Sequence, residues 1–113
     1  MRMKKPYRIK KNETIKAILN LHKSSKDRYL SVYVSDNQKA HFRYAISVSK
    51  AFGTAVKRNK IKRQIRMIFQ NSGIKRSMDI VVIVRPHARV LDYHTLKTRL
   101  EKLFNNLNLY EEV

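Results

Sequence analysis

The run Ile80-Val-Val-Ile-Val84 places the strongest constraint on what this 113-residue chain can fold into. A strand with one solvated face alternates apolar and polar side chains, whereas this run is apolar on both faces. It therefore predicts a central strand that ends at Arg85-Pro86, lies within a sheet and is covered on both sides. The run is far shorter than the roughly 20 apolar residues that cross a membrane, so we expect no membrane partner.

Two further segments, residues 29–34 and 42–49, alternate in polarity and predict two more strands. The pair Asp36-Asn37 favours a turn between them, so we expect these two strands to pair antiparallel. Their less apolar faces carry aromatic, hydroxyl and cationic side chains, namely Tyr29, Tyr33, Arg43, Ser47 and Ser49. We therefore expect the sheet to expose a polar surface that can hold a ligand.

Three helices are predicted from capping residues and apolar stripes. Asn12 can cap a first helix over about residues 13–22, and Thr54 can cap a second that runs to about Asn71. Asp92 can cap the third. The first helix has an apolar face that consists of Ile15, Ile18, Leu19 and His22.

The expected fold is of the α/β class, an α+β sandwich with a single mixed sheet and helices packed on it. The element order is roughly α-β-β-α-β-α, with room for one more short strand. A length of 113 residues suits one domain, so we expect residues 1–113 to form a single domain. About the first eleven residues form a basic, mobile N-terminal arm in this interpretation.

The charge distribution indicates a polyanionic partner. Lys and Arg number 26 against 8 Asp and Glu, a net charge of +18. Between Asp36 and Asp79 there are 42 residues without an acid, and they include eleven bases, whereas the last 22 residues are nearly balanced. Such an uneven excess predicts a binding surface for RNA rather than a uniform solubilising coat.

The second helix carries the strongest functional signal. At 100° per residue, Ile61, Ile65 and Phe69 fall on one apolar stripe. Residues 57–66 contain six bases and no acid. A solvated helix face usually mixes signs, because like charges one turn apart repel, so this clustering predicts phosphate binding. The residues assigned to this surface are Lys57, Arg58, Asn59, Lys60, Lys62, Arg63 and Arg66.

These residues belong to a longer pattern. Ser47-Val-Ser-Lys50 is followed by Gly53-Thr-Ala-Val-Lys-Arg58-Asn59-Lys60-Ile-Lys62-Arg63-Gln-Ile-Arg66, and the chain opens with Tyr7-Arg-Ile-Lys-Lys-Asn12. This pattern resembles the bacterial ribonuclease P protein component family. The resemblance implies a left-handed β-α-β crossover and a catalytic RNA partner, ribonuclease P RNA, that removes the 5′ leader from precursor tRNA with Mg²⁺. It also implies that the basic helix lies against that RNA.

The resemblance further implies a cleft between the first helix and the sheet that holds the single-stranded leader. Within it we expect Tyr33, and also Tyr29, to stack on unpaired bases. Arg43 and Lys50 are expected to follow the leader phosphates, while Ser47 and Ser49 supply hydrogen bonds. Ile15 and Leu19 are either cleft wall or ordinary core. The basic arm residues Arg8, Lys10 and Lys11 are assigned diffuse RNA contacts.

No catalytic site on the protein itself is predicted. The four histidines show no metal-ligand spacing, and the chain has no carboxylate pair, nucleophile motif or glycine-rich phosphate loop. We expect a non-catalytic subunit of an endoribonuclease, with Mg²⁺ at the RNA active site and no metal site on the protein. The absence of cysteine fits the cytoplasm.

Two other classes of protein remain as alternatives. A ribosomal or other structural RNA-binding protein would share the charge and the small fold. A DNA-binding regulator is disfavoured, because the sequence shows neither a helix-turn-helix pair nor a dimerisation heptad, and we expect no DNA partner.

Overall fold

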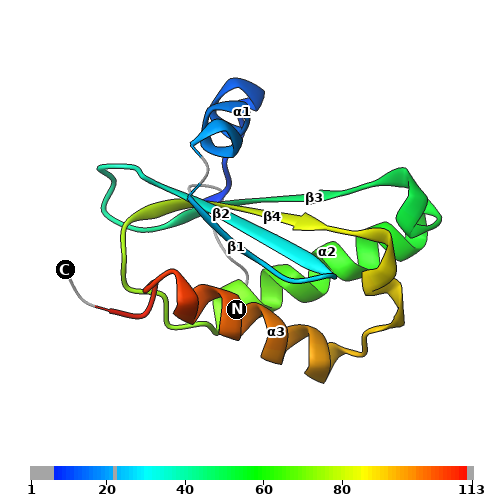
Figure 1. Ribbon diagram of the computed structural model, residues 1–113. Coiled ribbons are helices and arrows are strands. Elements are labelled where there is room, and N and C mark those ends of the chain that lie inside the picture. Colours follow the sequence, from blue (N-terminus) through cyan, green and yellow to red (C-terminus); the bar gives the residue numbers. More distant parts are fainter. Residues whose placement is uncertain (1–6, 22, 112–113) are drawn as a thin grey trace.

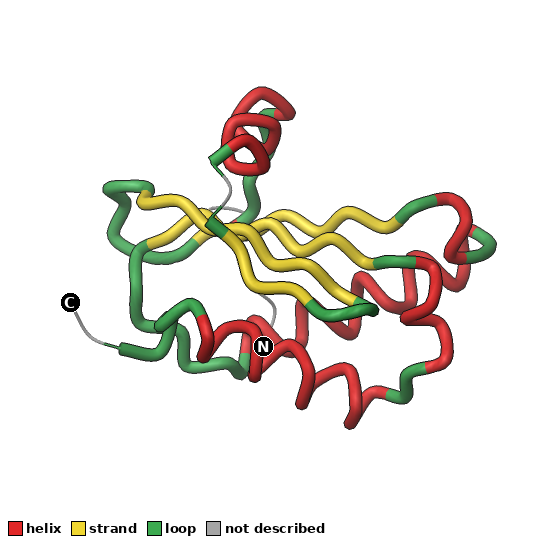
Figure 2. The backbone as a smooth tube through the Cα atoms, viewed as in Figure 1, coloured by secondary structure: helices red, strands yellow, loops and turns green. Residues whose placement is uncertain are grey.

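A four-stranded sheet forms the middle layer of the molecule, with one helix on one face and two on the other (Figure 2). The computed structural model describes residues 7–21 and 23–111. Along the chain the elements are α1 (Asn12–Asn20), β1 (Ser24–Lys26), β2 (Leu30–Asp36), β3 (Arg43–Val48), the 3-10 helix η2 (Lys50–Phe52), α2 (Ala55–Gln70), β4 (Met78–Val84), the 3-10 helix η3 (Pro86–Val90) and α3 (Tyr93–Asn106). Helix α1 stands alone above the sheet, while α2 and α3 lie below it (Figure 1). The predicted α+β class and element order are confirmed.

Strand β4 lies at the centre of the sheet, as its two apolar faces predict. The strand order is β1-β2-β4-β3, with β4 antiparallel to β2 and parallel to β3. The predicted antiparallel pairing of β2 with β3 is therefore wrong. A strand covered on both faces has no water for its backbone N–H and C=O groups, so it needs a hydrogen-bonded strand along each edge. Strands β2 and β3 occupy those two edges. Because β3 and β4 are parallel, they are joined by a crossover, which runs through η2 and α2 (Figure 1).

Strand β1 forms the edge of the sheet next to β2, with Ser25 opposite Val32. It is the additional short strand for which the sequence left room. Its three residues, Ser-Ser-Lys, carry no alternation of polarity, so no local pattern marks it. A turn at Asp27 joins β1 to β2: the Asp27 carboxylate oxygen Oδ1 accepts the backbone N–H groups of Tyr29 and Leu30 at 2.7 and 2.8 Å.

The main core lies between the sheet and the helices α2 and α3. Alternate residues of β2 and β4 point into it, and Phe69 of α2 stacks on Tyr44 at a ring-centroid distance of 4.7 Å. Phe69 also contacts Phe104 of α3 at 5.2 Å. A second, smaller cluster on the opposite face consists of Ile9, Ile18 and Val81, and it attaches α1 to the sheet.

The helix starts follow their caps in two of three cases. The Thr54 hydroxyl accepts the backbone N–H of Lys57, and the Asp92 carboxylate accepts that of Thr95 at 2.8 Å, as predicted. Helix α1 begins at Asn12 itself, with Lys11 at the cap position and no side-chain cap bond. The predicted Asn12 cap is therefore wrong, because the Lys11 carbonyl already accepts the Ile15 amide. This helix ends at Asn20, and the predicted His22 lies outside the described residues.

The N-terminal segment is attached to the sheet from residue 7 onward, which corrects the predicted arm over the first eleven residues. Arg8 forms a β-bridge with Tyr44, and the Ile9 amide donates to the Tyr44 carbonyl at 2.8 Å. Ile9 is 8% exposed. Burial of this one apolar side chain, together with the backbone hydrogen bond, holds the basic segment along β3. Residues 1–6 of the predicted arm lie outside the described residues. Across residues 7–21 and 23–111, no helix combines the length and apolar character needed to cross a membrane.

Candidate nucleic-acid interface

The apolar stripe of α2 anchors the helix in the main core and decides which charged side chains face outward. Ile61, Ile65 and Phe69 are 0–5% exposed, as the predicted stripe requires. With these residues buried, the basic side chains are divided between two flanks and the outer face of the helix. Asn59 and Arg63 are exposed, and Arg58 is half-buried. In the described part of the chain, no ion pair joins these bases to an acidic side chain.

One flank of α2 faces the N-terminal segment and α1. Lys62 and Arg66 line a hollow of about 160 Å³ together with Arg8, Ile15 and Ala45. Burial raises the pKa of the Tyr44 phenol behind this hollow, while the nearby positive charges of Arg66 and Arg8 oppose that rise. This flank therefore brings cations from two distant parts of the sequence to the edge of the sheet beside α1.

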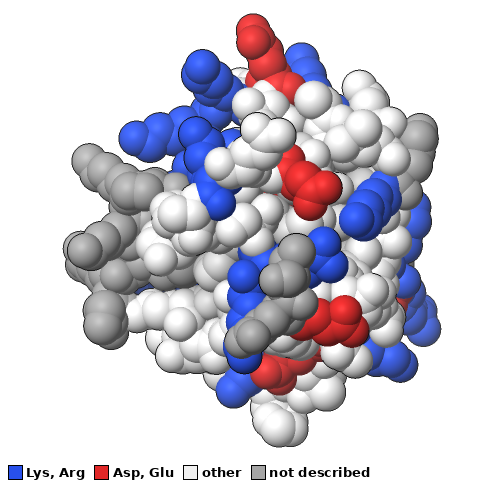
Figure 3. Space-filling model, turned by 90° about the vertical axis from the view of Figure 1, so that its left-hand side faces the viewer, with Lys and Arg blue, Asp and Glu red and all other residues white. Residues whose placement is uncertain are grey.

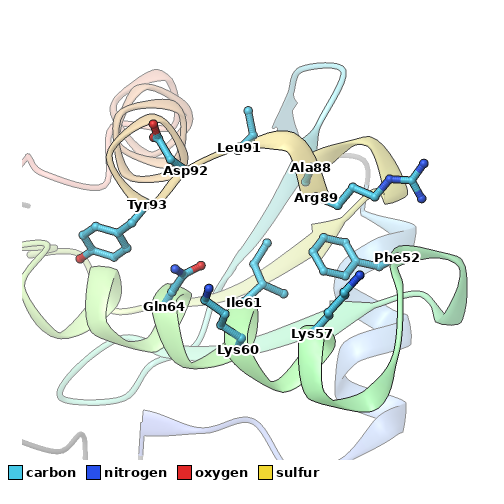
Figure 4. A pocket seen from close by; sticks show the side chains of 10 residues that line it. All are labelled: Phe52, Lys57, Lys60, Ile61, Gln64, Ala88, Arg89, Leu91, Asp92 and Tyr93. Atoms are coloured by element: carbon cyan, nitrogen blue, oxygen red, sulfur yellow. The ribbon is translucent and has the colours of Figure 1, made fainter.

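The other flank of α2 faces η3 and the start of α3. Lys57, Lys60 and Gln64 line a cavity of about 440 Å³ on this side (Figure 4). The basic helix is thus bordered by a hollow on each flank, which a charge pattern read at 100° per residue does not reveal.

The sheet face beneath α1 carries the predicted leader-cleft residues Tyr33 and Ser47. Tyr33 of β2, Val81 of β4 and Ala45 of β3 form one cross-strand row. Ser31, Ile83 and Ser47 form the next, and Ser47 is exposed. Tyr33 is half-buried, with the Lys26 amino group 5.8 Å from its ring centroid.

Helix α1 covers this face with the two aliphatic residues whose role the sequence left open. Ile15 and Leu19 are half-buried and pack against the cluster of Ile9, Ile18 and Val81. They therefore belong to a small core, and they also border the polar sheet face.

Tyr29 does not join Tyr33, which corrects the prediction that both lie in one cleft. Its ring lies beneath the guanidinium of Arg99 on α3, 4.5 Å from the Arg99 carbon Cζ, and so packs on the opposite side of the sheet. The cause is the turn at Asp27, because β2 begins only at Leu30 and the strand alternation does not extend to residue 29.

Arg43, which the sequence analysis assigned to leader phosphates, has a carboxylate partner within the protein. Its Nη2 lies 2.6 Å from Oδ2 of Asp79, a residue that is 4% exposed, and the hydrogen bond raises the pKa of Arg43. The sequence signal for this pair was available but missed: Asp79 is the acid that ends the acid-free stretch, next to a buried strand, where a carboxylate needs a partner.

Ser49 and Lys50 lie beyond the end of β3, in the connection that leads through η2 to α2. Both are exposed. They therefore lie between the last residue of β3 and the start of the basic helix.

The basic residues of the N-terminal segment lie together near the start of α1. Arg8, Lys10 and Lys11 line a hollow of about 530 Å³ with Lys39 of the β2–β3 connection. Figure 3 shows the end of the molecule that carries this connection, where acidic side chains lie among the basic ones. No cluster of three or more histidines or carboxylates suited to a metal ion occurs among residues 7–21 and 23–111.

Comparisons of the sequence and of the fold with known proteins lead to one family. The sequence model of the family described as Ribonuclease P matches residues 3–108. The ribonuclease P protein component of Streptococcus pneumoniae (strain Hungary19A-6) is 40% identical over 112 residues, covering 97% of this chain and 91% of that protein. The structure of the Staphylococcus aureus RNase P protein is 39% identical, with a TM-score of 0.85 and coverage of 93% and 98%. The RNase P protein from Thermotoga maritima is 32% identical, with a TM-score of 0.80 and coverage of 88% and 96%.

Proposed function

Because this chain belongs to the ribonuclease P protein family, we propose that its two RNA-binding surfaces hold ribonuclease P RNA and the 5′ leader of precursor tRNA side by side. The chain is the protein component of an endoribonuclease, and ribonuclease P RNA is its partner. The observation that carries the proposal is the position of Lys62 and Arg66, which line one hollow together with Ile15 of α1.

The first surface, the basic helix surface, consists of Lys57, Arg58, Asn59, Lys60, Lys62, Arg63 and Arg66 on α2. Its cations neutralise phosphates of ribonuclease P RNA and release the counterions that those phosphates hold. Asn59 is uncharged and exposed, so it contributes hydrogen bonds to sugar, base or backbone. Arg8, Lys10 and Lys11, which line one hollow beside α1, add diffuse long-range attraction for RNA.

The second surface, the leader cleft, consists of Tyr33 and Ser47 on the sheet with Ile15 and Leu19 on α1. Tyr33 stacks on an unpaired base of the leader, which tolerates any sequence because every base has a π face. The Ser47 hydroxyl supplies a short hydrogen bond. Lys50, beyond the end of β3, contacts a phosphate where the leader approaches the basic helix surface.

The chemical contribution of the protein is positioning and electrostatics, while the RNA supplies the active site and holds Mg²⁺ there. A polycation next to two RNAs reduces their mutual repulsion when the substrate docks. The protein therefore lowers the Mg²⁺ concentration that cleavage requires. In this proposal, residues 1–113 act as one RNA-binding domain in the cytoplasm, and the absence of cysteine is in keeping with that compartment.

The decisive experiment is cleavage of a 5′-extended precursor tRNA by a bacterial ribonuclease P RNA at low Mg²⁺, with and without this protein. We expect correct 5′ processing to be restored by the protein, and no cleavage by the protein alone. If the RNA is active at high Mg²⁺ and the protein restores nothing at low Mg²⁺, the positioning role is wrong.

A further inference from the structure

The cavity of about 440 Å³ between α2 and the η3–α3 connection has the features of a preformed binding site. Its volume lies within the range of roughly 300–1,000 Å³ that small-molecule sites occupy. Its floor is apolar and rigid, because Phe52, Ile61 and Ala88 come from three different elements and are 0–5% exposed. It lies on the flank of α2 that faces away from α1, so it is separate from the leader cleft.

The wall formed by η3 and α3 is held at both ends. Pro86 begins η3, and the Leu91 amide donates to the Ala88 carbonyl at 3.0 Å. Asp92 then caps α3 through the Thr95 amide. These local hydrogen bonds fix the connection opposite α2, so the cavity exists without a ligand that orders it.

Aromatic rings and cations line this cavity. In Figure 4, Phe52 and Tyr93 lie at opposite ends of the cavity, with Ile61 between them. Lys57 and Lys60 of α2 are exposed at the rim. The Gln64 side chain, whose amide both donates and accepts hydrogen bonds, lies next to Lys60.

We propose that this cavity binds one unpaired nucleotide. Its base contacts the aromatic rings of Phe52 and Tyr93 and the side chain of Ile61, and its phosphate contacts the amino groups of Lys57 and Lys60. The Gln64 amide pairs with the polar edge of the base. A purely electrostatic surface would need the lysine side chains but not the two aromatic rings that line the cavity.

A nucleotide has two possible sources, a splayed nucleotide of ribonuclease P RNA or a free mononucleotide. The inference rests on the proposed function in one respect, because Lys57 and Lys60 also belong to the basic helix surface. The experiment therefore has to report on the cavity itself and on RNA binding separately.

The chain contains no tryptophan, so the Tyr93→Trp variant carries a single indole that reports on the cavity. We would titrate this full-length variant with adenosine monophosphate and, in a second arm, with ribonuclease P RNA, and follow indole fluorescence. Retention of the same RNA in a gel measures RNA binding independently. Ribose 5-phosphate serves as the ligand control because it lacks a base. Tyr110→Trp serves as the probe control, because Tyr110 lines neither of the hollows beside α2.

We expect the RNA to quench the fluorescence of Tyr93→Trp but not that of Tyr110→Trp, and ribose 5-phosphate to quench neither. Quenching by RNA alone identifies an RNA nucleotide as the occupant, and quenching by adenosine monophosphate shows that a free nucleotide also enters. Normal RNA retention without quenching by either ligand overturns the cavity proposal and leaves the proposed function intact. Absence of RNA retention contradicts the proposed function, and the adenosine monophosphate arm then decides the cavity proposal alone.

A substitution pair tests the same inference without a probe. Tyr93→Leu removes the ring, whereas Tyr93→Phe keeps it. We expect Tyr93→Leu to weaken binding of ribonuclease P RNA by about 5-fold or more, within the roughly 5- to 150-fold range that stacking of one base represents. Tyr93→Phe should stay within about twofold of the parent. Equal affinities for the two variants, with unfolding transitions in urea that match the parent, would contradict stacking at this position.

Discussion

Arg43 and Asp79 lie opposite each other at one end of the parallel β3–β4 ladder and share two hydrogen bonds, Nε to Oδ1 at 2.8 Å and Nη2 to Oδ2 at 2.6 Å. The Asn37 amide donates a third bond to Oδ1 at 3.0 Å. Since Asp79 is 4% exposed, its carboxylate depends on these donors. These hydrogen bonds attach the β2–β3 connection to β3 and β4. The Asp79 carboxylate also neutralises Arg43, which the sequence analysis assigned to leader phosphates.

Replacing Arg43 should therefore affect stability much more than RNA binding. We expect Arg43→Gln to lower the free energy of unfolding by about 2 kcal/mol, because a buried carboxylate loses its charged donor. Urea unfolding at pH 7 measures this loss, and the double variant Arg43→Gln, Asp79→Asn should recover part of it. In buffer without urea, where Arg43→Gln is fully folded, a large fall in its affinity for the precursor leader would show that Arg43 contacts RNA.

The two tyrosines of the β2 region form a matched pair for testing the leader cleft. Tyr33 lies on the α1 face and Tyr29 lies under Arg99 of α3. We expect Tyr33→Ala to weaken binding of precursor tRNA, but not of mature tRNA, by roughly 5- to 150-fold, the equivalent of about 1–3 kcal/mol for one stacked base. Tyr29→Ala should lower stability without changing the ratio of the two affinities. If both variants discriminate precursor from mature tRNA as well as the parent does, Tyr33 is not part of the leader cleft.

The basic helix surface predicts a specific dependence on salt. Removing one phosphate contact with Lys62→Gln should reduce the slope of log affinity against log salt concentration by about 0.7 to 0.9. Lys102→Gln is the matched control, because Lys102 is exposed on α3 and lines neither hollow beside α2. Filter binding of ribonuclease P RNA at several salt concentrations provides the measurement. Identical slopes for the two variants would place the phosphate contacts elsewhere.

Tyr110 predicts a loss of stability at alkaline pH. Burial, with a smaller contribution from the charge of Glu101, raises the pKa of Tyr110 to about 12. In the unfolded chain a tyrosine has a pKa of about 10, so the unfolded state loses the proton first as the pH rises. The stability associated with this group is fully present below pH 10 and is lost between about pH 10 and pH 12.

Tyr110→Phe should flatten this alkaline decline by about 2 kcal/mol over that interval. At pH 7 the variant should be at least as stable as the parent, because the Tyr110 hydroxyl is buried with no hydrogen-bond partner in the described part of the chain. Urea unfolding from pH 8 to pH 11.5 compares the two proteins. Parallel curves would mean that the phenol titrates equally in the folded and unfolded states.

Strand β2 and the turn that follows it show which features the sequence could predict. The alternation in β2 placed Leu30, Val32 and Val34 on the buried face, and all three are 0% exposed. It placed Tyr29 with Tyr33, which the Asp27 turn prevents, because a side-chain hydrogen bond set where the strand begins. Likewise, a turn at Asp36-Asn37 was predicted, but a turn between two strands does not say whether they pair or have a third strand between them.

The sequence by itself determined the central strand β4, the three helices and the uncompensated charge of α2. These features depend on the spacing of residues that are close together in the sequence, so the sequence pattern alone can predict them. Only the tertiary structure decided that β4 separates β2 from β3, that Asp79 forms an ion pair with Arg43, and that α2 has a hollow on each flank. These relationships join residues tens of positions apart, and they follow from burying both faces of β4 and pairing its one buried carboxylate at the same time.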